Sequence, residues 1–179
     1  EVFREELLVR PLSKTGEYVL VVEPQRLLQP NESVPIGIVG DLHVPERHHS
    51  LALKQMVESR IAVPGQNDVY SFQLTGRSLL YFDSLSKDER IRWTLSGPSG
   101  TAMNQRRFDQ SDTSLTNPVM DLPAGSYTLT INATGLATPF YRFQLLDLDA
   151  TPVLASDQFD VTFALKNETD IRRITAGAG

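Results

Sequence analysis

The chain has 179 residues, of which 40% are hydrophobic and 22% charged, and a formal net charge of −5 at pH 7. These proportions are those of a globular protein and exclude wholesale disorder, while the scattered, net acidic charge makes nucleic acid a poor partner. The absence of cysteine excludes disulfides, thiolate metal sites and cysteine nucleophiles. No apolar run is long enough to cross a bilayer, so we expect no membrane insertion.

The first 49 residues contain one strand-like segment, Gly16–Val22, and a later group of histidines. The group consists of His43, His48 and His49, with Glu46 beside them. Histidine and glutamate are zinc ligands, but adjacent histidines on an extended chain point to opposite faces. A solvated connecting loop is therefore the favoured interpretation, and zinc the alternative.

The middle of the chain alternates apolar and polar residues, which is typical of half-buried β-strands, and glycine and proline separate the alternating segments. Ser50–Ser59 also fits a helix, which we rank below an extended conformation. Short strands at this spacing predict an all-β fold, an antiparallel β-sandwich of jelly-roll type. The expected strands are Val69–Leu74, Leu79–Phe82, Ile91–Leu95, Tyr127–Ile131 and Tyr141–Leu145.

Aromatic residues in these strands are the expected anchors of the core. The five expected anchors are Phe72, Phe82, Trp93, Tyr127 and Phe143. Tyr81, Phe140 and Tyr141 could instead be exposed and stack on sugar rings, although the core is again the favoured location. We interpret the basic stretch Asn104–Arg107 as the solvated end of a hairpin.

Two segment pairs indicate an internal repeat. Ile61–Val69 aligns without gaps with Phe163–Ile171, at an offset of 163 − 61 = 102 residues, and Asp68 matches Asp170. Gly16–Val22 aligns with Gly125–Ile131 at an offset of 125 − 16 = 109. We therefore expect residues 1–48 to be the C-terminal part of one repeat, residues 49–150 a complete β-sandwich repeat, and residues 151–179 the N-terminal part of a third.

The pattern of the middle unit resembles bacterial pre-peptidase C-terminal domains. The resemblance is carried by Asp68–Leu74, by Gly76 with Leu79–Phe82, by Trp93–Gly97, by Leu122–Ile131 and by Tyr141–Leu145. It implies a β-sandwich module of a secreted peptidase or of a large surface protein of the adhesin or hemolysin-like kind. It also implies an extracellular or cell-surface location, and in some relatives calcium near the substrate.

Acidic residues near the expected junction of two repeats are candidates for a metal site. Asp147 and Asp149 share a face of a strand because they are two residues apart, and carboxylate oxygens are calcium ligands. The sequence suggests a calcium site at Asp147, Asp149 and Asp170, with Asp68 an alternative partner. Calcium is the one cofactor suggested.

Catalytic residues are not expected. The three histidines are confined to one stretch, and no strand–Gly-x-Ser-x-Gly elbow accompanies them. We therefore predict a non-catalytic, structural or adhesive repeat module whose partners are neighbouring repeats and a surface glycan or extracellular protein. The alternative is a ligand-binding accessory domain of a secreted hydrolase, holding a polysaccharide or protein fibre with calcium.

Overall fold

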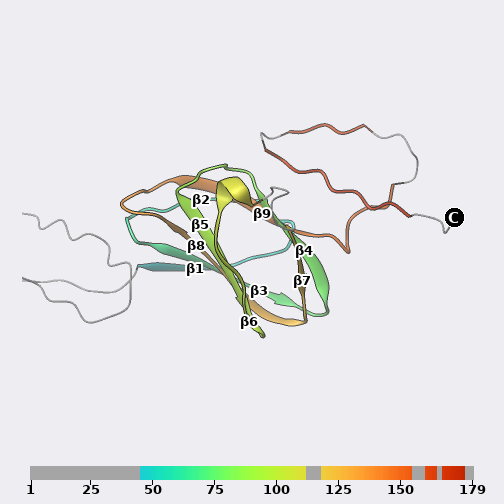
Figure 1. Cartoon of the computed structure of the whole chain (residues 1–179), viewed down its shortest axis with the longest axis horizontal. Coiled ribbons are helices and arrows are strands. Elements are labelled where there is room, and N and C mark those ends of the chain that lie inside the picture. The colour runs from blue at the N-terminus through green and yellow to red at the C-terminus, as the bar shows by residue number, and fades with distance from the viewer. Residues whose placement is uncertain (1–44, 112–117, 155–159, 165–166, 176–179) are drawn as a thin grey trace, which may run out of the picture.

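The computed structural model describes residues 45–111, 118–154, 160–164 and 167–175, and the regular secondary structure of these residues is almost entirely β-strand (Figure 1). Nine strands form two sheets, and the described residues include a single 3-10 turn, Phe108–Gln110. Sheet A has the spatial order β1 (Glu46–Ser50), β3 (Asn67–Leu74), β8 (Gly125–Ala133), β5 (Ile91–Gly97) and β6 (Gly100–Arg107). Sheet B has the order β2 (Val57–Arg60), β9 (Phe140–Asp147), β4 (Ser78–Ser84) and β7 (Val119–Leu122).

The strand order is that of a jelly roll. From β2 to β9 successive strands alternate between the two sheets, except for the β5–β6 hairpin within sheet A. All neighbouring strands pair antiparallel except β1, which adds to the edge of sheet A parallel to β3. The predicted all-β sandwich of jelly-roll type is confirmed.

The expected strands all form, and they are the interior strands of the two sheets. The helix alternative for Ser50–Ser59 is wrong, because this stretch ends β1, makes a turn and begins β2. The interpretation of Asn104–Arg107 as a hairpin end is also wrong. These residues belong to edge strand β6, where their side chains are exposed or half-buried and leave no alternating apolar signal.

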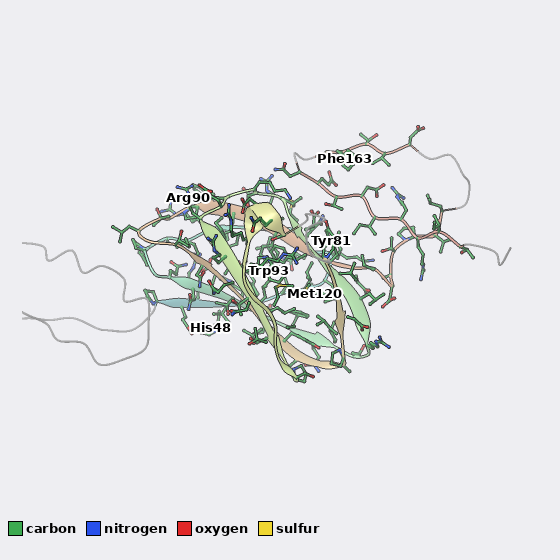
Figure 2. The ribbon with its side chains drawn as sticks, in the orientation of Figure 1. His48, Tyr81, Arg90, Trp93, Met120 and Phe163 are labelled. Carbon is green, nitrogen blue, oxygen red and sulfur yellow. The ribbon has the colours of Figure 1, made fainter. Side chains whose placement is uncertain are left out.

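Stacked aromatic rings from both sheets form the centre of the core. The ring centroids of Phe82 on β4 and Trp93 on β5 lie 4.3 Å apart, and those of Phe82 and Phe143 lie 5.1 Å apart. Trp93, labelled near the middle of the sandwich in Figure 2, is fully buried, and its indole N–H donates to Ser111 Oγ at 2.8 Å. All five predicted anchors are buried, as expected.

The three aromatic residues of uncertain orientation divide between core and surface. Tyr81 and Tyr141 are buried, as favoured, whereas 71% of Phe140 is exposed. Burial of Phe140 was therefore the wrong expectation. Since β9 turns Tyr141 and Phe143 into the core, its period of two places Phe140 on the outer face.

After β9 the chain continues into a C-terminal segment, defined here as residues 151–175. Figure 1 shows it as the orange-to-red chain that leaves the sandwich beside β4 and β9. A parallel bridge between Val153 and Arg173 closes this segment. Among the described residues, no helix is long and apolar enough to span a membrane. The expected upstream repeat fragment lies almost wholly outside the described residues, and the repeat boundaries stay a prediction.

Candidate functional site

A fully buried carboxylate, Asp68, lies between the edge strands of the two sheets. Its oxygens accept from Arg47 Nε at 2.8 Å and from the Arg47 terminal nitrogen at 2.6 Å. The Tyr141 hydroxyl and the Gln66 amide also donate to it, and the Tyr70 and Tyr141 hydroxyls lie 2.7 Å apart. We call these five residues the Asp68 cluster.

Opposing effects determine the protonation of this cluster. Burial alone would raise the pKa of Asp68, but hydrogen bonds from Arg47, Tyr141 and Gln66 outweigh it and hold that pKa below its ordinary value. The hydrogen bond to Asp68 in turn raises the pKa of Arg47. Burial, reinforced by the bonds to Asp68 and Tyr70, raises the pKa of Tyr141. At neutral pH the cluster therefore pairs an ionised carboxylate with a guanidinium and neutral phenols.

The Asp68 cluster acts as a clamp, meaning that its hydrogen bonds hold the edges of the two sheets together. Arg47 projects from β1 in sheet A, yet its terminal nitrogen also donates to Ser59 Oγ at 3.3 Å and to the Arg60 carbonyl in sheet B. One side chain thus links the edges of both sheets. Because Asp68 already accepts four donors, its oxygens have little capacity left for the alternative calcium role considered from the sequence.

A second buried carboxylate, Asp83 on β4, has polar partners from both the sandwich and the C-terminal segment. Within the sandwich it accepts from Gln144 Nε2 at 2.8 Å. From the C-terminal segment, the Thr169 hydroxyl donates to it at 2.8 Å and the Thr169 N–H at 3.4 Å. Asn167 Nδ2 also donates to the Leu85 carbonyl at 3.5 Å. We call this set the Asp83 contact.

The three residues predicted to bind calcium have other partners. Asp147 Oδ1 accepts the Asp149 N–H at 3.0 Å, and Asp149 Oδ2 accepts the Leu79 N–H at 3.1 Å. Asp170 pairs with Arg172, with 2.9 Å between oxygen and Nε. Over the part of the chain that the structure describes, no three His, Asp or Glu residues gather as a metal-binding group. Calcium binding stays a prediction.

His48 and His49 lie on edge strand β1 and point to different neighbours, as expected for adjacent residues of a strand. His49 stacks on Tyr70, with ring centroids 4.9 Å apart, whereas His48 Nε2 lies 3.3 Å from a Glu46 carboxylate oxygen. Figure 2 shows His48 at the edge of the sandwich. His43, the third histidine of the zinc alternative, lies outside the described residues.

The exposed Phe140 borders a shallow depression of about 610 Å³ at one end of the sandwich. Its other lining residues are Ser86, Lys87, Asp88, Glu89, Arg90 and Asp109. Arg90 pairs with Asp88 at 2.6 Å, and the Arg60 guanidinium lies 5.4 Å from the centroid of the Phe140 ring. An apolar ring next to charged and hydroxyl groups is a surface that could bind a polar ligand with one apolar face.

The sequence identified Asp68 but not its partner Arg47, and it did not predict the contact between Asp83 and Thr169. Asp68 and Thr169 both lie at matched positions of the two aligned segments, but an alignment does not show what either side chain binds. The sequence around Arg47 is polar throughout, and it does not show which carboxylate the arginine pairs with.

No protein-family model matches the chain, and no curated protein matches it. Solved structures similar to it include the pre-peptidase C-terminal domain of a collagenase from Bacillus anthracis, at 14% identity and a TM-score of 0.43, covering 56% of this chain and 96% of that one. A mutant of PliG, a periplasmic inhibitor of g-type lysozyme from Escherichia coli, has 16% identity and a TM-score of 0.45, covering 57% and 98%. PliG of Salmonella Typhimurium has 18% identity and a TM-score of 0.44, covering 56% and 98%.

Proposed function

We propose that this chain is a non-catalytic β-sandwich repeat module of a secreted or cell-surface bacterial protein, with a structural or adhesive role. The observation that carries the proposal is the Asp83 contact, in which a buried carboxylate of the sandwich holds the segment expected to open the next repeat. Such a contact fixes the direction in which the chain leaves the unit. A fixed exit direction is what a spacing module in a surface protein requires.

The hydrogen bonding of the buried polar side chains supports the same proposal. Within the described residues, every buried side-chain nitrogen and oxygen has a hydrogen-bond partner. The Asp68 cluster uses its arginine, carboxylate and tyrosines to join the edges of the sheets. These groups contribute to specific packing, as satisfied buried polar networks do.

A distance measurement between two spin labels tests the structural role. The chain has no cysteine, so Ala52→Cys and Thr175→Cys, both at exposed positions, accept labels without interference. We expect a narrow distance distribution by pulsed electron spin resonance, since the Asp83 contact holds the C-terminal segment on the sandwich. A distribution as broad as that of a flexible tail would reject the spacing role.

The depression beside Phe140 favours a second candidate function, a ligand-binding accessory domain of a secreted hydrolase. An exposed aromatic ring can stack on a sugar or on a peptide side chain while neighbouring polar groups provide orientation. Panels of polysaccharides and collagen-type fibres test it, with Phe140→Ala as the variant and Leu136→Ala, another exposed apolar residue, as the matched control. Binding that is lost only in Phe140→Ala would support this function, and uniformly negative panels would reject it.

A further inference from the structure

Strand β4 of sheet B is buried on both of its faces. Leu80 and Phe82 point into the core and are 0% and 1% exposed. Tyr81 and Asp83 alternate with them on the outer face, yet they are only 8% and 0% exposed. Figure 2 shows Tyr81 on the side of the sandwich from which the C-terminal segment extends. Because the outer face of an antiparallel sandwich usually faces water, another part of the chain must cover β4 here.

The C-terminal segment covers the carboxylate of Asp83. The Thr169 hydroxyl donates to Asp83 Oδ1 at 2.8 Å, and the Thr169 N–H donates to Asp83 Oδ2 at 3.4 Å. Two residues earlier, Asn167 Nδ2 donates to the Leu85 carbonyl at 3.5 Å. Gln144, opposite Asp83 on β9, donates to the same carboxylate from within the sandwich. The buried carboxylate thus lies between an amide of the sandwich and a threonine of the segment.

These contacts discriminate between side chains. Every residue except proline has a backbone N–H, but only serine, threonine and tyrosine have a hydroxyl that can donate to the second carboxylate oxygen. Asn167 supplies an amide N–H to a backbone carbonyl, an acceptor that is present whatever residue the sandwich has there. Between them, Glu168 Oε2 accepts the Ala164 N–H of the segment itself at 2.8 Å. The sandwich therefore contacts the first and third positions of an Asn-x-Thr sequence.

Apolar burial contributes little to the contact. Three apolar side chains of the segment, Val161, Phe163 and Ile174, are 36%, 57% and 73% exposed. Figure 2 shows Phe163 away from the core that surrounds Trp93. Polar contacts of this kind exchange with bonds to water at a modest net cost. The segment can therefore leave Asp83 without exposing a large apolar surface.

We propose that the outer face of sheet B around Asp83 is a binding site for protein segments that carry an Asn-x-Thr sequence, and that the C-terminal segment occupies this site in cis. The inference rests on the Asp83 contact of the proposed function and adds the chemical class of its ligand. The effective concentration of a segment tethered by a short linker reaches the millimolar range. A partner segment therefore binds at Asp83 only where the C-terminal segment has left, so that the C-terminal segment regulates access to the site.

A release variant and a pair of peptides test the site. The release variant, Asn167→Ala/Thr169→Val, removes both polar side chains of the contact from the full chain. The probe is the capped peptide Asn-Glu-Thr-Asp-Ile, which has the sequence of residues 167–171. The control peptide Asn-Glu-Val-Asp-Ile has the same charge and nearly the same shape, but no hydroxyl.

The side-chain amide of Gln144 reports binding, because it donates to Asp83 at 2.8 Å. In NMR spectra of the release variant, the threonine peptide should shift the Gln144 amide resonances in a saturable manner, and the valine peptide should not. The wild type should need at least about tenfold more threonine peptide for the same shift, because the tethered segment competes. Asp83→Ala in the release variant should abolish the saturable shift.

Spin-label distances separate the possible failures. The labels at Ala52→Cys and Thr175→Cys should give a broader distance distribution in the release variant than in the otherwise unchanged chain. A broad distribution without a saturable shift, or with equal shifts from the two peptides, would reject the binding site and leave the spacing role intact. Equal affinity of the threonine peptide for the wild type and the release variant would reject occupation in cis. A distribution that stays narrow in the release variant would show that the Asp83 contact does not hold the segment, and would contradict both proposals.

Discussion

Arg47 on edge strand β1 holds both carboxylate oxygens of the buried Asp68 on β3, at 2.8 and 2.6 Å. The pair lies between the sheets, and Arg47 also bonds to Ser59 and Arg60 of the opposite edge strand. It explains why a strand as polar as Glu46–Ser50 adds to sheet A. The stability of this edge depends on a charge pair more than on apolar burial.

Substitution of Arg47 and substitution of Asp68 should both destabilise the sandwich, but by different amounts. Arg47→Ala leaves a buried, ionised Asp68 without its cation and should cost about 3 kcal/mol in the free energy of unfolding. Asp68→Asn removes the buried charge and should cost less. The double variant should lose less than the sum of the single variants, because the two residues act as one unit. Urea denaturation measures all three, and additive losses would contradict the clamp.

The stability that Asp68 contributes should depend on pH. Because its pKa is lower in the folded chain than its ordinary value of 3.8, the contribution is fully present above about pH 5 and decreases as the pH falls through the folded pKa. The difference in unfolding free energy between the wild type and Asp68→Asn should therefore shrink between pH 5 and pH 2. Contributions from Asp88 and Asp121, whose pKa values are also lowered, cancel in this difference. A difference constant with pH would contradict the assignment.

Gly97 should not accept a side chain. A Cβ atom at this position would lie 2.2 Å from Cε1 of Tyr127, a buried ring whose hydroxyl donates to the Pro123 carbonyl at 2.8 Å. Gly97→Ala should cost about 1–3 kcal/mol, because the ring must move. Gly76→Ala is the matched control, since a Cβ atom there would meet no other atom within 4 Å, and should change stability by less than about 0.5 kcal/mol. Equal effects of the two substitutions would show that Tyr127 repacks freely.

Calcium binding at Asp147, Asp149 and Asp170 has a direct thermal test. A ligand that binds only the folded state raises the melting temperature, so millimolar calcium should raise it and a chelator should reverse the rise. The rise should disappear in Asp149→Asn, and magnesium serves as the control cation. An unchanged melting temperature in calcium would remove the hypothesis.

The sequence predicted the central strands and missed those at the edges, for a physical reason. Strands such as Tyr141–Leu145 have one face against the core, which imposes an apolar period of two. Edge strands β1 and β6 have mostly exposed or half-buried side chains, so no such period appears in their sequences. The same alternation could have placed Phe140 outside, opposite in orientation to Tyr141.

The polar contacts were less accessible to prediction than the strands. Arg47 and Asp68 are 21 residues apart, and Asp83 and Thr169 are 86 apart. Such contacts between polar residues far apart in the sequence depend on how the folded elements pack against one another. The positions of charged residues in the sequence do not determine that packing. The repeat alignment, by contrast, pairs Gly65 with Asn167, and both residues have a positive φ, of 77° and 66°, because local turn chemistry is encoded locally.

The most direct test of the account is the hydrogen exchange of the Thr169 and Arg173 amides in Thr169→Val, which removes the hydroxyl bonded to Asp83 and keeps the side-chain shape. We expect exchange at both amides to become about tenfold faster, the loss of one hydrogen bond to a charged group, while the melting temperature of the sandwich stays unchanged. Asp83→Asn should add little to this effect in the double variant, and Thr175→Val is the matched control. Exchange rates equal to those of the wild type would show that Asp83 does not hold the C-terminal segment, and would contradict the proposed spacing role.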